Sequence, residues 1–287
     1  MRIVYKSDNG LTIEIGGTSF YKLKRRIFDS VSTSAQTVKP TMFDGAITEN
    51  LVLEQRNISI EGIFVAAIKE NFMDHQNTLY AVFNPKFVGM LYCYYNDKAV
   101  QIRCRTLATP DMQEQTKRSC VFSVELLSDD AYWESAEMYY TSIGILESLL
   151  TFPRSVGLEG LPYGRTNIMG VINNITTINI PPIIEVFSTT DTFIKVENLT
   201  TSEYFIIDQT IEPSQKMIID VKHRQASIWE MQIDGAFHFV KNVLNYLTTD
   251  STLWELVPGL NEIKITTGNP DDTSEAIISY RLKFGGV

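Results

Sequence analysis

The chain has 287 residues, of which 44% are hydrophobic and 21% are charged. These values are typical of a globular protein with one large domain or two ordinary ones, long enough to bury a sizeable core. The formal net charge of -9 argues against nucleic-acid binding as the main activity, because neutralising phosphates requires a surplus of Lys and Arg.

The N-terminal sequence and the cysteines indicate the compartment. Residues 1–6 lack the apolar segment and cleavage site of a signal peptide. No run of about eighteen apolar residues occurs, so we expect no membrane-spanning segment. Cys93, Cys104 and Cys120 form no CxxC motif, and each lies in an apolar run. We therefore expect buried free thiols in a protein assembled in reducing cytoplasm.

Two polar segments precede the first clear strands. Lys22, Lys24, Arg25 and Arg26 form a short basic run, which fits either a solvated strand edge or a subunit contact. The segment of residues 30–50 begins with a stretch dominated by Ser, Thr, Ala, Gln, Lys and Pro. A loop of this length inside a compact domain is unusual unless it has a function. We therefore expect it to leave the domain body as an extended excursion.

Periodicity predicts β-strands and one helix in the rest of the first half. Residues 57–64 alternate between apolar and polar, which is typical of a half-buried strand. Residues 92–104 predict a hairpin, and residues 119–127 predict a further strand. Apolar residues in the segment 67–83 recur at helical spacing, so we expect an amphipathic helix that ends before Pro85.

A change of pattern separates two halves of the chain. Gly and Pro punctuate residues 129–174, where the periodicity fades, so we place a domain boundary near residue 140. The second half shows short apolar segments between turns, which favours a β-sandwich. The predicted fold is all-β with one short helix, in domains of residues 1–140 and 141–287. The strands expected in the second domain are 183–187, 193–196, 204–207, 217–221, 260–266 and 276–284.

The residues that usually carry catalysis or bind cofactors show no recognisable pattern. There is no GxGxxG, GxxxxGK[ST] or GxSxG motif, and the glycine-rich segment 157–164 fits a linker. His75, His223 and His238 form no HxH or HxxxH pair and are expected at the surface or the core edge. We therefore assign no catalytic residue, no cofactor site and no metal site, and we do not expect an enzyme.

Two ligand hypotheses stay open beside simpler explanations. Oxygen-bearing side chains alternate in residues 269–275, a spacing that could hold calcium. This segment lacks the central glycine of an EF-hand loop, and a solvated hairpin loop explains it as well. Trp133, Trp229 and Trp254 could stack sugars, whereas large aromatic residues in a β-sandwich more often belong to the core.

Several short motifs follow one another along nearly the whole chain. The first half contains RNISIEG at residues 56–62, FNPKFVGML at 83–91 and DDAYW at 129–133. The second half contains IKVENLTT at residues 194–201, MIID at 217–220 and LVPGLNEI at 256–263. In this order they resemble the motifs of the distal tail protein family of long-tailed, non-contractile phages. Ala131 stands where the family usually has proline, and Ser202 stands where it has glycine.

The resemblance implies a fold and a role. The N-terminal domain would form a hexameric ring at the tail tip, with residues 30–50 as an arm that embraces the neighbouring subunit. The rest, residues 141–287, would be a linker and a galectin-like β-sandwich that supports receptor-binding proteins. The partners implied are the tail tube protein, a tail-associated fibre or lysin protein, and a receptor-binding protein. No cofactor or membrane is implied, and DNA would pass through the pore without specific binding.

The family also implies a location in the virion, at the tail tip, after assembly in the host cytoplasm. Some of the net charge of -9 would then line the pore and prevent DNA from adhering. The alternative is a carbohydrate-binding adhesin module of a virion or cell surface. An enzyme such as a wall hydrolase is a third hypothesis, and it would need an acid pair or metal centre that the sequence does not display.

Overall fold

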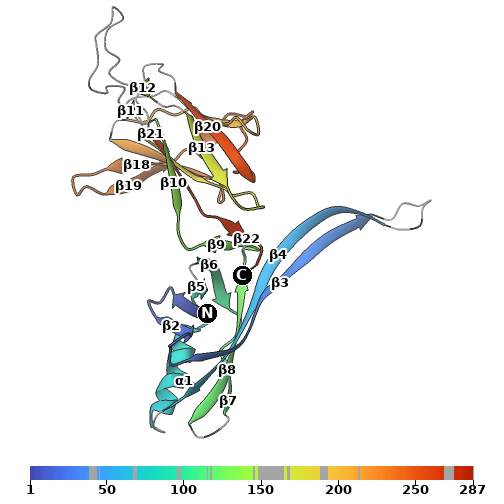
Figure 1. Ribbon diagram of the computed structural model, residues 1–287. Coiled ribbons are helices and arrows are strands. Elements are labelled where there is room, and N and C mark those ends of the chain that lie inside the picture. Colours follow the sequence, from blue (N-terminus) through green and yellow to red (C-terminus); the bar gives the residue numbers. More distant parts are fainter. Residues whose placement is uncertain are drawn as a thin grey trace, which may run out of the picture. The chain divides into compact units, whose positions relative to one another are not determined.

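The computed structural model describes residues 1–38, 44, 46–66, 70–95, 98–114, 116, 118–144, 146–147, 165–166, 169–187, 193–212, 214–267 and 275–286. The chain divides into two compact units (Figure 1), unit 1 comprising residues 1–137 with 283–287 and unit 2 comprising residues 138–282. Strands dominate both units and the α-helix lies in unit 1, so the predicted all-β fold with one helix in the first domain is confirmed.

Unit 1 is built on one large antiparallel sheet. Its strands follow the order β2-β1-β5-β6-β8-β4-β3, while β7 pairs with β8 and β9 joins both β6 and β22. The elements are β1 (Arg2–Ser7), β2 (Thr12–Gly16), β3 (Lys22–Val38), β4 (Ile47–Val65), α1 (Glu70–Val82), β5 (Val88–Tyr95), β6 (Lys98–Thr106), β7 (Asp111–Glu114), β8 (Ser119–Ser128), β9 (Trp133–Ser135) and β22 (Lys283–Phe284).

The core of unit 1 follows the periodicities of the sequence. On β4, Ile58, Ile60 and Phe64 are buried, as their alternation predicted. The predicted helix is α1, which buries Phe72 and Leu79 against the same core cluster. The expected hairpin and the strand after it are β5, β6 and β8, although the turn between β5 and β6 lies outside the described residues.

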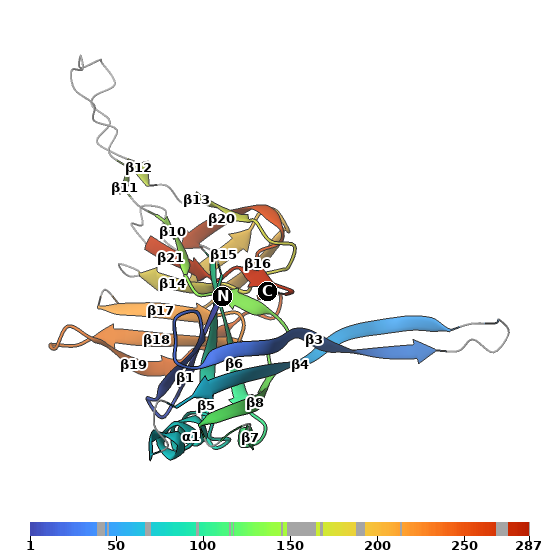
Figure 2. The same cartoon turned by 60° about the horizontal axis from the view of Figure 1, so that its bottom comes forward.

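The segment of residues 30–50 is not the loop that its composition suggested. Residues 30–38 continue β3 and residues 47–50 begin β4, and these two strands form one long antiparallel hairpin. β8 pairs with β4 only from Arg56 to Val65, so the outer hairpin, residues 31–38 with 47–55, is a ribbon of two strands (Figures 1 and 2). Its sequence shows no clear alternation because neither face of this ribbon covers a core.

The last residues of the chain belong to unit 1, whereas the pattern of the sequence predicted them in the second domain. β22 pairs with β9, where Lys283 lies opposite Glu134 and Phe284 lies opposite Trp133. Trp133 is fully buried and Phe284 packs against the unit 1 core. The backbone pairing and the packing of Phe284 against the core hold the C-terminal strand in the first unit, a long-range contact that local patterns do not reveal.

Unit 2 contains two larger antiparallel sheets, as expected for the β-sandwich. One sheet has the order β10-β21-β14-β17-β18-β19 and the other has the order β13-β20-β15-β16, while β11 and β12 form a small separate ladder. The elements are β10 (Tyr139–Ile143), β11 (Leu146–Glu147), β12 (Arg165–Thr166), β13 (Met169–Asn174), β14 (Ile183–Phe187), β15 (Ile194–Asn198), β16 (Glu203–Ile207), β17 (Gln215–Asp220), β18 (Gln225–Met231), β19 (Phe237–Asn242), the 3-10 turn η1 (Leu244–Tyr246), β20 (Gly259–Thr267) and β21 (Glu275–Tyr280).

The strands that the sequence predicted in unit 2 each have one buried face, although β18, which buries Ala226 and Ile228, was not predicted. On β14, Ile184 and Val186 are fully buried, and on β17 Met217 and Ile219 are fully buried, so each strand alternates clearly. β19 was not predicted, because nearly all of its side chains are exposed and no alternation marks it. A strand at a sheet edge receives its conformation from backbone pairing with its neighbour rather than from an apolar face.

Candidate functional site

The outer hairpin is the most unusual surface of unit 1. Leu51 is 67% exposed and Val52 is 60% exposed, and Val38 and Leu53 are also exposed. Successive side chains of a strand point to opposite faces, so both faces of the ribbon present apolar groups. A ribbon of two strands is marginally stable by itself in water. The apolar run at residues 51–53 was the signal in the sequence that could have revealed this surface.

The basic run predicted at a strand edge or a subunit contact lies on β3, at one edge of the unit 1 sheet. All four side chains are exposed. Lys24 forms an ion pair with Glu61 at 2.6 Å, and the guanidinium of Arg26 lies 5.1 Å from the centre of the Phe28 ring. The run therefore covers the inner part of β3 with positive charge, adjoining the outer hairpin.

A buried arginine lies at the base of the hairpin. Arg56 is 1% exposed and is the first residue of β4 that pairs with β8, next to the outer hairpin. It donates hydrogen bonds to the carbonyls of Phe28 on β3, Ala131 before β9 and Gly285 in the C-terminal segment. One side chain thus joins three segments that are distant in the sequence, and it orients the point at which the hairpin leaves the sheet.

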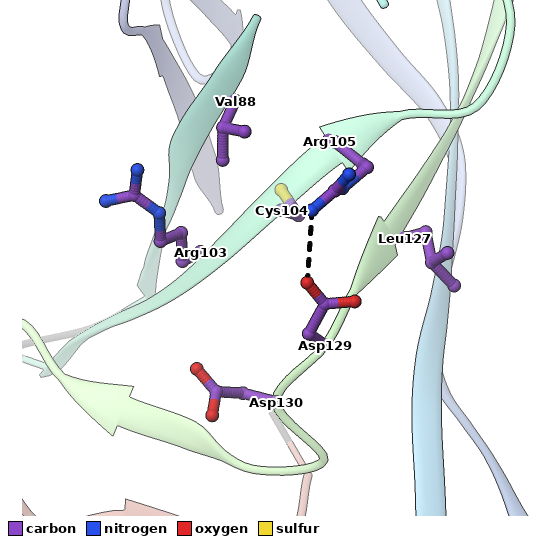
Figure 3. A pocket seen from close by; sticks show the side chains of 7 residues that line it. All are labelled: Val88, Arg103, Cys104, Arg105, Leu127, Asp129 and Asp130. Atoms are coloured by element: carbon purple, nitrogen blue, oxygen red, sulfur yellow. Dashed lines mark hydrogen bonds and ion pairs between the residues drawn. The ribbon is translucent and has the colours of Figure 1, made fainter. Parts of the chain in front are cut away.

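A cavity of about 250 Å³ lies beside this region and has a charged lining (Figure 3). Arg105 and Asp129 form an ion pair across 3.2 Å in it, and Arg103 pairs with Asp8 at the same distance. Both pairs are more than half exposed, so they contribute little to stability. The remaining lining residues are Val88, Cys104, Leu127 and Asp130.

The cysteines are buried free thiols, as the sequence predicted. Burial raises the pKa of Cys93 to about 12 and also raises the pKa of Cys104, which adjoins the charged cavity. A reactive cysteine needs an accessible thiolate, so neither group offers a nucleophile near neutral pH. The thiols act as small apolar core groups.

The histidines occupy the positions expected for surface or core-edge residues. His75 stacks on Phe20 at a ring distance of 4.1 Å. His223 pairs with Asp220 and His238 pairs with Asp234, both near the surface. Among the described residues, no group of three or more His, Cys, Asp or Glu is arranged to hold a metal ion. Most of the segment 269–275, considered for calcium, lies outside those residues.

The tryptophans differ in their surroundings. Trp133 and Trp254 are buried, and Trp254 donates a hydrogen bond to the carbonyl of Val196. Both are therefore core residues and cannot stack on a sugar. Trp229 is partly exposed and contacts Phe239 edge to face, at a ring distance of 5.8 Å.

No helix among the residues that the structure describes is long and apolar enough to cross a membrane.

The motif residues of unit 1 have packing roles. A Cβ at Gly62 would lie 2.7 Å from Cε1 of Phe122, a buried ring, so only glycine fits there. A Cβ at Gly89 would lie 2.6 Å from the carbonyl oxygen of Lys6. The first motif thus combines a buried arginine, a buried strand face and a glycine required by close packing.

The motif residues of unit 2 are buried amides that hold turns. Asn261 donates to the carbonyls of Val257 and Gly259 and accepts from the Val257 amide. Asn198 donates to Asn261 and accepts from the backbone N–H of Thr200. Both asparagine side chains are fully buried, and each forms hydrogen bonds with backbone groups of a turn. The motifs therefore specify a scaffold rather than a reaction centre.

Comparison with known proteins agrees with this description. Residues 13–128 match the family described as the phage tail protein RIFT-related domain. Residues 175–284 match the family described as the siphovirus-type tail component, C-terminal domain. The two matches follow one another and together span most of the chain. A search of curated protein sequences found no match.

Solved structures show the same fold at low sequence identity. The Dit (gp 19.1) protein of SPP1, described as a paradigm of the hub adsorption apparatus in phages that infect Gram-positive bacteria, is 12% identical. It has a TM-score of 0.69, with 98% of this chain and 99% of that protein covered. Chains of the phage P2 baseplate in its activated conformation, with Ca and with Sr, have TM-scores of 0.53. They are 8% and 10% identical, and each comparison covers 100% of both chains.

The two family matches, one in each unit, define a phage tail protein. The chain belongs to the siphophage distal tail protein family, which the order of its motifs predicted. It is accordingly a component of the virion tail.

Proposed function

We propose that the chain is the structural hub of a siphophage tail tip and that unit 1 closes into a hexameric ring. The observation that carries this proposal is the outer hairpin, an exposed ribbon with Leu51 and Val52 on its two faces. Exposed apolar groups of this kind mark interaction sites. In a ring every subunit has one hairpin and one neighbour on that side. Each neighbouring subunit would therefore cover one ribbon.

Ring closure requires a heterologous contact, in which one surface of a subunit binds a different surface of the next. A hairpin that leaves its own sheet meets this requirement, because it can reach a surface that its own unit does not present. The buried Arg56 supports the same idea, since its hydrogen bonds hold the hairpin base in one orientation. A fixed exit angle would favour closure over an open filament.

The ring would connect the tail tube protein to a tail-associated fibre or lysin protein, and unit 2 would carry a receptor-binding protein for host attachment. DNA would pass through the pore without specific binding, aided by the net charge of -9. A strongly positive lumen in an image of the ring would contradict this last point. We propose a role in assembly and docking at the tail tip, without catalysis, for a protein assembled in the host cytoplasm.

The test compares the full chain with a variant in which Leu51, Val52 and Leu53 are replaced by serine. Light scattering and negative-stain imaging of the unaltered protein should give the mass of a hexamer and a six-fold ring with a hole. The variant should remain folded and lose the ring. A matched control replaces Val65, which is 60% exposed outside the outer hairpin, and should keep it.

The result that would overturn the proposal is a ring that persists with the serine variant. If the unaltered protein is a monomer, the same comparison is made by co-expression with the tail tube protein. A monomer under both conditions that binds glycans specifically would favour the adhesin alternative.

A further inference from the structure

The exposed edge of the large unit 2 sheet is formed by β19. Among the residues that the structure describes, β19 pairs with β18 alone, and five of its six side chains are exposed. An edge strand offers unpaired backbone donors and acceptors to any strand that lies beside it. Proteins commonly protect such edges with proline, charged side chains or β-bulges. β19 contains no proline, and its exposed Lys241 and the register shift of its pairing with β18 lie C-terminal to Phe239.

The hydrogen bonds identify which backbone groups face outward. The Gln232 amide donates to the carbonyl of Ala236, so this is a hydrogen-bonded pair of the hairpin. In an antiparallel ladder such pairs alternate with pairs that exchange no backbone hydrogen bond. The neighbouring pair, Met231 and Phe237, is therefore of the kind without hydrogen bonds. The Met231 amide instead donates to the carbonyl of Ser214, on the opposite side of β18. The backbone of Phe237, and by the same alternation that of Phe239, therefore points away from β18.

The same two residues belong to an apolar surface. Phe237 meets Phe187 edge to face, and Phe239 meets Trp229 in the same way. A cavity of about 480 Å³ opens beside them. Its lining contains apolar side chains and a few amides and a hydroxyl, which is typical of a pocket that receives an apolar group. The lining residues are Phe187, Ser214, Gln215, Met231, Gln232, Ile233 and Phe237.

The charges around this cavity are unequal. Lys216 lies over the Phe237 ring, and its charge is already balanced by Glu185 at 2.7 Å. Glu212, Glu230 and Asp234 each adjoin a lining segment, and a ring nitrogen of His238 lies 3.0 Å from a carboxylate oxygen of Asp234. The described rim of the cavity is therefore acidic, and a partner with basic side chains would complement it.

We infer that β19 is a docking edge for an extended segment of a partner tail protein, in which apolar residues alternate with Lys or Arg. The segment pairs with the outward backbone of Phe237 and Phe239, places an apolar side chain in the cavity and sets its basic groups against the acidic rim. The inference rests on the proposed hub function, since it assigns one partner contact of the hub to a defined surface.

The experiment uses the full chain and a fluorescein-labelled peptide of sequence KVRFKVRI, with binding followed by fluorescence anisotropy. The peptide should bind to the unaltered chain. Its affinity should fall about tenfold when Phe239 is replaced by serine, because an aromatic anchor is lost. Replacement of Leu260, which is 63% exposed on the other sheet against 58% for Phe239, is the matched control and should not change binding.

Two further measurements separate strand pairing from general adhesion. Two peptides are N-methylated at every second residue, one at the odd and one at the even positions. Their affinities should differ, because only one of the two patterns removes the backbone donors directed at β19. Changing Glu212 and Glu230 together to glutamine should weaken binding about threefold to tenfold, with a smaller dependence on salt. A peptide with Glu in place of Lys and Arg should bind weakly.

The inference is overturned if KVRFKVRI fails to bind, if both methylated frames bind equally, or if the Phe239 and Leu260 variants behave alike. It is also overturned if the surface binds glycans in a Phe239-dependent way and no peptide. Ring formation is measured on the same samples by light scattering. A ring without peptide binding leaves the hub proposal standing and removes this one. Peptide binding without a ring, also when the tail tube protein is co-expressed, leaves the contact at the β19 edge standing and removes the hexameric ring.

Discussion

Replacing Arg56 by methionine should destabilise unit 1 severely while leaving unit 2 intact. The substitution keeps a long side chain of similar volume and removes the guanidinium donors. The carbonyls of Phe28, Ala131 and Gly285 each accept a hydrogen bond from Arg56, at 2.6 Å for Phe28 and at 3.0 and 2.7 Å for the two bonds to Ala131. Those acceptors would lose this donor in a region that is largely closed to water.

The magnitude follows from the number of acceptors. Each buried acceptor left without a partner costs about 1–3 kcal/mol, and Arg56 donates to three carbonyls. We expect a loss of about 3–5 kcal/mol in the free energy of unfolding of unit 1. Lysine at position 56 keeps the charge but lacks the planar fork, so Arg56→Lys should recover only part of this loss.

The assay is denaturant unfolding followed by hydrogen exchange with mass spectrometry, because a chain of two units need not unfold in one step. Peptides from β4 and β8 report on unit 1, and peptides from β14 and β17 report on unit 2. The reasoning would be refuted by a change of less than about 1 kcal/mol in unit 1, within the range of an ordinary surface substitution. Equal losses in both units would refute it as well.

Three other predictions concern the core of each unit. Gly62→Ala should cost unit 1 about 1–3 kcal/mol, because the added Cβ overlaps Phe122, whereas Gly285→Ala, which meets no atom within 4 Å, should be nearly neutral in thermal unfolding. Unit 1 should lose stability as the pH rises from 9.0 towards about 12, because the unfolded chain releases the Cys93 proton that the folded chain keeps; Cys93→Ala should flatten this dependence in unfolding measured against pH. Asn261→Leu should cost unit 2 about 2–4 kcal/mol in denaturant unfolding, since the backbone groups of its turn lose their partners.

Each of these predictions has a result that contradicts it. Equal melting temperatures for the Gly62 and Gly285 variants would show that Phe122 yields to an added methyl group. An unchanged alkaline slope in the Cys93 variant would assign the pH dependence to other groups, such as Tyr5, whose pKa burial also raises to about 12. A neutral Asn261 variant would mean that water reaches the turn.

The fold class and the family could be predicted because they depend on local signals. Ile58 and Ile60 alternate with polar residues, since one face of β4 covers the core, and the same logic identified β14 and β17. The burial of the thiols at Cys93 and Cys104 was likewise predictable, since each lies in an apolar strand. No catalytic or metal site was assigned from the sequence. The surfaces proposed for function are the outer hairpin and the edge formed by β19.

What the sequence by itself determined is therefore the helix α1, the strands with the clearest alternation, such as β4, β14 and β17, the family motifs and the acidic balance. Only the tertiary structure decided that residues 31–38 and 47–55 form a ribbon, that Arg56 joins three distant segments, and that the C-terminal strand returns to unit 1. The reason is physical: an element that covers a core carries a period in its own residues. A ribbon, an edge strand or a buried clamp is defined by backbone pairing and by partners far along the chain.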